Sequence, residues 1–120
     1  SIALIGKRRK IPVNEYRGLT WVYHMLENIL RVVELPADTY HIGSQNGLGR
    51  YDVLRHVFNE LGIGDRAGEL LIPDREKYGD HPRDIRLETG KLESFGITFP
   101  SSAEAISDCL ESFSMRNMVV

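Results

Sequence analysis

The stretch HPRDIRLETGKLESFGITFP, residues 81–100, joins a charged strand pattern to a helix pattern. In RDIRLE the apolar residues Ile85 and Leu87 alternate with charged ones, which predicts a half-buried strand. Thr89 is the expected cap of a one- to two-turn helix that ends at Gly96, and ITFP predicts another extended segment. A short helix between short extended segments indicates an α/β fold.

The same stretch gathers positive charge around one carboxylate. His81, Arg83, Arg86 and Lys91 lie close together in the sequence, with Asp84 among them. In a strand, Asp84 and Arg86 point to the same side, so one interpretation is a simple ion pair. The other is that the cations neutralise a diphosphate while the carboxylate accepts hydrogen bonds from sugar hydroxyls. The residues alone leave both interpretations open.

Three longer helices are predicted outside this stretch. The first begins near Thr20 and ends before Pro36. Its apolar stripe comprises Trp21, Val22, Met25, Leu26, Ile29, Leu30 and Val33. The second begins near Arg50 and ends at Gly62, and one of its faces carries Tyr51, Leu54, Val57, Phe58 and Leu61. The third opens with the capping box of Ser101 and Glu104, and its inward residues are Ala103, Ile106, Leu110 and Phe113.

Short extended segments are predicted between the helices. They are SIALIG and IPVNEY near the start, TYHIGS at 39–44 and LLIP at 70–73. A short helix through Glu69 has Asp65 as its expected cap, and residues 74–82 are expected to form a loop. The whole pattern is helix-rich with short strands.

Composition places the chain among globular domains of ordinary charge. It has 120 residues, of which 42% are hydrophobic and 27% charged, and its net charge is −2. This charge gives no overall attraction to nucleic acid or anionic membranes. No apolar run approaches the roughly 20 residues of a membrane span. A single cysteine, Cys109, excludes an internal disulfide framework, so we expect a cytoplasmic protein.

Cofactor and metal motifs are incomplete. The loop NGLGRYD has Gly47 and Gly49 of a dinucleotide-binding fingerprint, but Asp52 occupies the third glycine position and would repel phosphates. IGKRRK lacks the upstream Gly and the Ser/Thr of a P-loop. The basic run at 7–10 is interpreted as a solvated turn or as a surface that normally faces another part of the protein. The pairs His24/Glu27 and His56/Glu60 each supply too few ligands for zinc, and Cys109 is expected to be a small core residue.

Three segments in the right order resemble one family. HPRDIRLETGKLESFGITFP is similar to the C-terminal signature of extended short-chain dehydrogenases/reductases, nearest the dTDP-4-dehydrorhamnose reductase type. GLTWVYHMLENIL resembles the substrate-side loop and helix of that family. TYHIGSQNGLGRYDVLRHVFNELGI resembles its following strand, loop and helix. Together the resemblance covers about residues 10–113.

The resemblance implies a fold and a role. The fold is α/β, a small helix-rich substrate-binding lobe with short strands, the C-terminal part of an extended short-chain dehydrogenase Rossmann-type fold. Residues 1–120 then form a single lobe that lacks the dinucleotide-binding domain. The catalytic Tyr-x-x-x-Lys pair of the family is missing, because none of the five tyrosines has Lys four residues later. The chain is therefore expected to bind neither cofactor nor metal, while NAD(P) is implied for a full-length enzyme.

The site residues follow from the same resemblance. The expected ligand is a nucleotide-sugar, and its expected contacts are His81, Arg83, Asp84, Arg86, Arg17 and Thr20. No catalytic residue is assigned. The chain departs from the family where His81 replaces the Arg that commonly precedes the proline, and where Leu19 replaces a Pro.

These departures keep a second hypothesis open. The chain is then a non-catalytic binding or regulatory module of the same fold, like the regulatory subunit of methionine adenosyltransferase. A third is an independent small α/β domain whose resemblance is accidental. A lobe without its partner domain would expose apolar surface, so we expect a tendency to self-associate.

Overall fold

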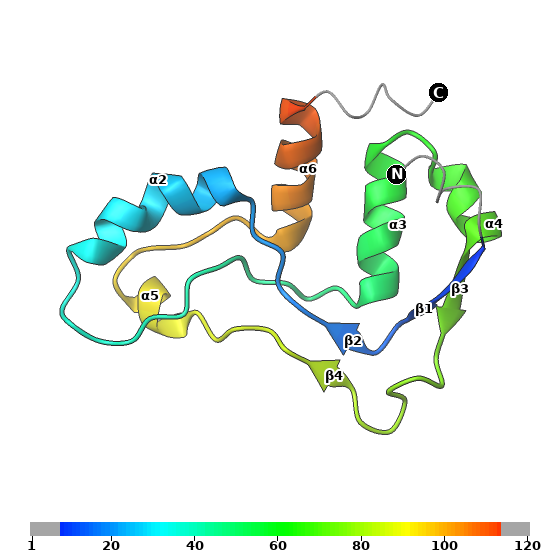
Figure 1. The fold of residues 1–120 in the computed structure, drawn as a ribbon, viewed down its shortest axis with the longest axis horizontal. Coiled ribbons are helices and arrows are strands. Elements are labelled where there is room, and N and C mark those ends of the chain that lie inside the picture. Colours follow the sequence, from blue (N-terminus) through cyan, green and yellow to red (C-terminus); the bar gives the residue numbers. More distant parts are fainter. Residues whose placement is uncertain (1–7, 114–120) are drawn as a thin grey trace.

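A computed structural model describes residues 8–113 as an arrangement of short strands and helices spread in a thin layer (Figure 1). In chain order the elements are β1 (Arg9–Pro12), β2 (Glu15–Tyr16), α2 (Val22–Val33), α3 (Arg50–Glu60), η1 (Gly64–Arg66), α4 (Ala67–Leu70), β3 (Leu71–Asp74), β4 (Arg83–Asp84), α5 (Gly90–Ser94) and α6 (Ser102–Ser112). The extents are 49 × 39 × 18 Å, and the radius of gyration is 16.4 Å. A compact domain of this length has a radius of gyration of roughly 14 Å, so the chain is unusually open.

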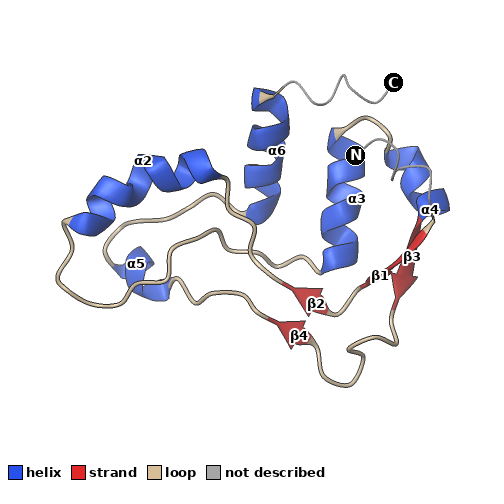
Figure 2. Cartoon of the chain, in the orientation of Figure 1, coloured by secondary structure: helices blue, strands red, loops and turns tan. Residues whose placement is uncertain are grey.

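Both sheets are parallel and have two strands (Figure 2). β1 pairs with β3 from Arg9 opposite Leu71 to Pro12 opposite Asp74. β2 pairs with β4, with Glu15 opposite Arg83. The mixed α/β class with short strands is therefore confirmed. No larger or closed sheet forms within the described part of the chain, and the Rossmann-type assignment stays a prediction.

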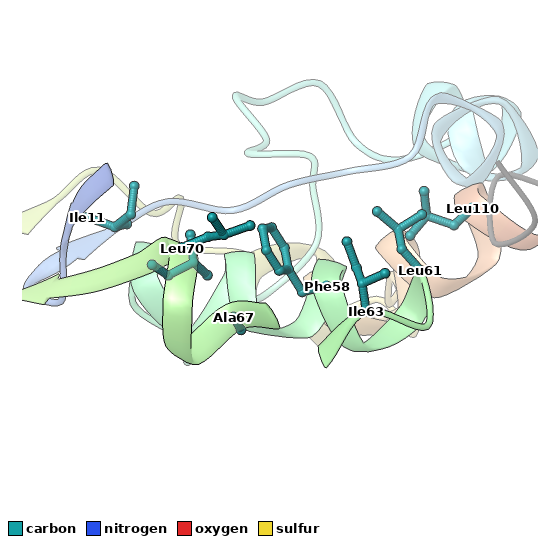
Figure 3. Close-up of a cluster of buried hydrophobic side chains, with 8 residues drawn as sticks. Ile11, Phe58, Leu61, Ile63, Ala67, Leu70 and Leu110 are labelled. Atoms are coloured by element: carbon teal, nitrogen blue, oxygen red, sulfur yellow. The ribbon is translucent and has the colours of Figure 1, made fainter. Parts of the chain in front are cut away.

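The core lies between the β1–β3 pair and helices α3, α4 and α6 (Figure 3). Its buried residues are Ile11, Phe58, Leu61, Ile63, Ala67, Leu70, Leu71 and Leu110. The predicted apolar face of α3 supplies Phe58 directly, and Leu61 follows where the helix ends. Gly62, at φ +80°, lets the chain turn out of the helix, as the sequence predicts.

The apolar stripe of α2 is largely exposed. Val22 and Leu26 are each 58% exposed, while Leu30 and Val33 are more than 70% exposed. α2 lies at one end of the molecule, away from the core of α3 and α4 (Figure 1). His24 is the residue of this helix that is buried, and its Nε2 lies 3.2 Å from Asp108 of α6. Helix α2 thus contacts α6 through His24, while Trp21, Met25 and Ile29 of the stripe are partly buried.

Several local predictions differ from the structure. TYHIGS at 39–44 forms no strand, and RDIRLE pairs only over Arg83–Asp84 because its other residues leave β2. Ile85 and Leu87 are about half exposed. Asp65 lies in η1, and neither Asp65 nor Thr89 makes a side-chain capping bond, so both capping predictions are wrong. Arg9 and Lys10 of the basic run lie in strand β1 and not in a turn. The predicted strand SIALIG and the end of the chain from 114 onward lie outside the described residues.

The last helix confirms its predicted start but not its whole inner face. Ser101 Oγ accepts the backbone N–H of Glu104 at 3.2 Å, as a capping box requires. Leu110 is buried, whereas Phe113 is 59% exposed at the end of the helix. The inward placement of Phe113 is therefore wrong.

Candidate functional site

Strand pairing brings the charged stretch beside the first polar loop. In the β2–β4 pair, Arg83 N–H donates to Asn14 C=O, and Ile85 N–H donates to Tyr16 C=O, both at 2.9 Å. This pairing sets the cations that follow Pro82 against Glu15 and Arg17. Residues far apart in the sequence thus meet at one edge of the molecule (Figure 1).

A buried carboxylate lies at the centre of this edge. The side chain of Glu15 is 4% exposed and faces three guanidinium groups. Arg50 Nη1 lies 3.1 Å from its Oε1, Arg83 Nε lies 3.7 Å from Oε2, and Arg17 Nη2 lies 3.8 Å from Oε2. Each arginine side chain is about half exposed, between 49% and 51%. Three positive charges and one negative charge leave a local excess of two positive charges.

Asp84 and Arg86 form a separate ion pair. Arg86 Nε donates to Asp84 Oδ1 at 2.8 Å and Nη2 donates to Oδ2 at 2.5 Å. Nη1 of Arg86 also donates to the carbonyl of Asn46 at 3.0 Å, and the guanidinium lies 4.8 Å from the ring centre of Tyr16. The pairing expected from strand alternation is therefore present. Most donors of Arg86 already have acceptors, which leaves less of its charge for a ligand.

This ion pair predicts the pH response of Asp84. The side-chain hydrogen bond from Arg86, helped by the Arg86 backbone N–H, lowers the pKa of Asp84 to about 2. A carboxyl with a lower pKa in the folded state stabilises the fold at pH values above its unfolded pKa of about 4. That contribution is lost as the pH falls through about 2. Carboxyl ¹³C NMR should show Asp84 ionised at pH 3, and R86Q should return its pKa towards about 4; the same low pKa in R86Q would contradict the pairing.

A polar cavity of about 730 Å³ adjoins the Asp84–Arg86 pair. It lies between the loop at 44–47 and the segment at 84–89. Its lining residues are Ser44, Gln45, Asn46, Gly47, Asp84, Arg86, Leu87, Glu88, Thr89 and Ser101. Hydroxyl, amide and carboxylate groups of this kind form hydrogen bonds with polyhydroxylated ligands. The volume lies within the range of roughly 300–1,000 Å³ that is usual for small-molecule sites.

Asn46 holds the cavity loop against the loop of Arg17. Its Nδ2 donates to the carbonyls of Arg17 at 2.7 Å and Leu48 at 2.8 Å, and its Oδ1 accepts from Leu48 N–H at 2.9 Å. A smaller cavity of about 260 Å³ lies on the other side of this asparagine. Asn46 lines both cavities, so the two are neighbours.

Ser102 fixes the 17–20 loop from the start of α6. It is fully buried, and its Oγ accepts Leu19 N–H at 2.7 Å and donates to Leu19 C=O at 2.9 Å. Its backbone N–H donates to the carbonyl of Gln45 at 2.8 Å. One serine therefore holds both the Arg17 loop and the wall of the polar cavity.

The predicted site residues form two pairs and two separate residues. Arg17 and Arg83 meet at Glu15, and Asp84 pairs with Arg86. Thr20 does not join them, because its Oγ1 accepts the backbone N–H of Ser44 at 2.9 Å. His81 is exposed, and it has no hydrogen bond or ion pair to any residue between 8 and 113.

Glu15, Arg50, Asn46 and Ser102 were not among the predicted site residues. Glu15 lies in a two-residue strand, and Arg50 follows the Gly-rich loop that we tested for a dinucleotide. A local signal existed only for Asn46, because asparagine often bonds its own loop backbone two residues on. Two of the histidines, His24 and His56, have structural roles: His24 contacts Asp108, and His56 Nε2 contacts the carbonyl of Ala103 at 3.0 Å and so joins α3 to α6.

Within residues 8–113 no group of three or more His, Cys, Asp or Glu side chains is placed to hold a metal ion. The same residues contain no helix with the length and apolar character needed to cross a membrane.

No family model matches the chain, and neither a curated protein nor a solved structure is significantly similar to it. The function must therefore be argued from the site.

Proposed function

We propose that the chain is the sugar-nucleotide-binding lobe of an NAD(P)-dependent nucleotide-sugar reductase or epimerase-like enzyme, of the dTDP-4-dehydrorhamnose reductase type. The observation that carries the proposal is the meeting of Arg17 and Arg83 on the buried Glu15, beside a polar cavity. Both arginines are among the contacts that the sequence resemblance implies for a nucleotide-sugar.

The positive charge of the arginine cluster matches the negatively charged diphosphate in the middle of a sugar nucleotide. A sugar nucleotide carries a diphosphate, which guanidinium groups bind through paired N–H donors. Arg17 and Arg83 each contact Glu15 through a single nitrogen at more than 3.5 Å, so most of their donors remain available to a ligand. The buried Glu15 holds the arginines in place, and its negative charge offsets the electrostatic repulsion between the guanidinium groups.

The polar cavity suits the hydroxyl-bearing part of the ligand. Asp84 and Glu88 provide carboxylate acceptors at its wall, and Thr89 and Ser101 provide hydroxyl groups. Asn46 lies in the wall of the cavity, and its side-chain amide donates a hydrogen bond to the carbonyl of Arg17. A ligand with its diphosphate at the arginines can therefore extend into this cavity.

In this proposal the chain binds and orients the substrate and does not carry out hydride transfer. A nucleotide-binding domain of a longer, cytoplasmic enzyme supplies NAD(P) and the catalytic Tyr and Lys. The exposed apolar side of α2, formed by Val22, Leu26, Leu30 and Val33, supports contact with such a domain. The same surface supports self-association of the isolated chain.

A second candidate is a non-catalytic binding module with the same fold. Two observations favour it: Arg86 is occupied by Asp84 and Asn46, and His81 stands where the family has a phosphate-binding arginine. The natural protein that contains this chain discriminates between the candidates. Oxidation of NAD(P)H with a nucleotide 4-keto-sugar supports the enzyme, whereas binding without oxidation supports the module.

The binding proposal is tested by calorimetric titration of the chain with dTDP-glucose, UDP-glucose and GDP-mannose at low ionic strength. We expect at least one of them to bind, and we expect free glucose not to bind. The double variant R17Q/R83Q should weaken binding at least about tenfold, since each arginine contributes charge-assisted hydrogen bonds.

The matched control is R55Q/R75Q. It removes the same charge from two exposed arginines that have no ion pair among the described residues. Its affinity should stay within about twofold of the unmodified chain, because distant surface charges are largely screened. Equal losses in both double variants, or no binding of any sugar nucleotide, would overturn the proposal.

A further inference from the structure

Arg50 enters the arginine cluster from a different part of the fold. It is the first residue of α3, and the preceding Gly49 packs against the turn between β1 and β2. A Cβ atom at Gly49 would lie 2.2 Å from the carbonyl oxygen of Val13, so any side chain there would push the helix away. This close approach lets Arg50 Nη1 reach Glu15 Oε1 at 3.1 Å. Arg50 therefore makes the shortest of the three contacts to the buried carboxylate.

The small cavity identifies the face that Arg50 presents to a ligand. Its volume is about 260 Å³, and Arg17 and Arg50 line it together with Glu15 and Asn46. The rest of its wall is apolar, formed by Leu19, Leu48, Val53 and Leu54. Neither Asp84 nor Arg86 reaches it. A charged group in this cavity is partly shielded from water by the leucines, which strengthens its attraction to the guanidinium groups.

The charge balance defines the kind of ligand. Arg17 and Arg50 line the cavity with Glu15, while Arg83 contacts the same carboxylate without lining the cavity. The whole cluster carries three positive charges and one negative charge, so a dianion neutralises it. A carboxylate supplies one negative charge, whereas a diphosphate that bridges two groups supplies two. Arg50 has five N–H donors, and Glu15 is the acceptor recorded for it among residues 8–113.

We propose that this cavity is part of a dianion site, in which Arg50 binds the ligand beside Arg17 while Arg83 contributes charge through the shared Glu15, and that it takes the diphosphate group. The assignment rests on the proposed function, because it names the part of the sugar nucleotide that binds here. Free pyrophosphate has the same two linked phosphate groups, with a higher negative charge because neither end is esterified, and is the simplest probe. Arg50 thus binds the ligand directly, and Glu15 is the positioning residue of the cluster.

The test compares inorganic pyrophosphate and a sugar nucleotide on the chain and on R50Q, R50K and R55Q. Binding is followed by backbone-amide NMR, which also locates the probe. We expect pyrophosphate to perturb the amides of residues 17–19 and 48–50, and R50Q to weaken it at least about fivefold. R55Q removes the same charge from the same helix, roughly 140° around its axis, and should change affinity less than about twofold.

The R50K variant shows whether the positive charge of Arg50 is sufficient for binding or whether the planar guanidinium is also required. R50K keeps the positive charge but loses the planar fork that binds two phosphate oxygens together, so its affinity should lie between those of R50Q and the unmodified chain. If R50Q does not fold, R50K takes its place in the test. We then expect R50K to bind pyrophosphate at least about twofold more weakly than R55Q does.

The outcomes distinguish this inference from the proposed function. If sugar nucleotides bind but R50Q and R55Q have equal affinities for pyrophosphate, the inference is wrong and the function stands. If sugar nucleotides fail to bind while pyrophosphate binds through Arg50, the function is wrong and the dianion site stands. A lower melting temperature in R50Q with unchanged pyrophosphate affinity would show that Arg50 only holds Glu15, which also overturns the inference.

Discussion

Replacing Phe58 by alanine should lower the free energy of unfolding by about 3–5 kcal/mol. Phe58 is 8% exposed and lies in the middle of the buried cluster, with Leu70 and Ala67 on one side and Leu61 on the other (Figure 3). The smaller side chain loses apolar burial and leaves a cavity that the short neighbouring elements cannot close completely. Total stabilities of small domains are about 5–15 kcal/mol, so F58A is expected to lose a large share of the stability of the fold.

Urea unfolding followed by circular dichroism measures the change. The matched control is F113A, which removes the same side chain from a position that is 59% exposed. Its free energy of unfolding should change by less than about 0.5 kcal/mol. The apolar pattern of the sequence had placed both phenylalanines inward. Similar losses in F58A and F113A would contradict the described core and favour the sequence-based placement.

The contrast between these two residues shows what the sequence determines. Helix α3 is predictable because its apolar residues recur at helical spacing and Gly62 supplies a local stop. Ser101 and Glu104 mark the start of α6 because they form a local capping signal. Whether the last residue of an apolar row is covered depends on which element lies opposite. No periodicity contains that information.

The candidate site was predictable where its contacts join residues close in the sequence, and not where they join distant segments. Alternation along a strand places Asp84 and Arg86 on the same side, and this pairing needs only neighbouring residues. The cluster at Glu15 instead depends on a parallel pairing of two-residue strands and on the approach of α3. Strands this short have no readable alternation. Glu15 and Arg50 therefore escaped sequence analysis, although Arg17 and Arg83 were selected through the family resemblance.

The exposed side of α2 is a case where the pattern and the structure agree in part. The apolar stripe exists at the predicted spacing, and the helix forms over Val22–Val33. Val22, Leu26, Leu30 and Val33 are nevertheless exposed, whereas Trp21, Met25 and Ile29 are partly buried. The helix contacts α6 through His24 and Asp108. An amphipathic pattern predicts that a face needs covering, but it does not state what covers it.

Replacing Ser102 by alanine should lower the free energy of unfolding by about 2 kcal/mol. The serine hydroxyl is the acceptor for Leu19 N–H and the donor to Leu19 C=O, across 83 residues of sequence. Alanine leaves both backbone groups without this partner at a position where Ser102 is fully buried. The control is S94A, because Ser94 Oγ donates to the carbonyl of Lys91 at an exposed position, and its loss should cost less than about 0.5 kcal/mol.

A second measurement connects this serine to the site. Hydrogen exchange at the Leu19 amide should become faster in S102A, because local opening of the 17–20 loop no longer has to break the bond to Oγ. Arg17 lies in that loop, so looser tethering should also weaken sugar-nucleotide binding while the Asp84–Arg86 pair is unaffected. If Leu19 exchanges at the same rate in S102A and in S94A, Ser102 does not hold the loop, and the position of Arg17 depends on Asn46 and Glu15 instead.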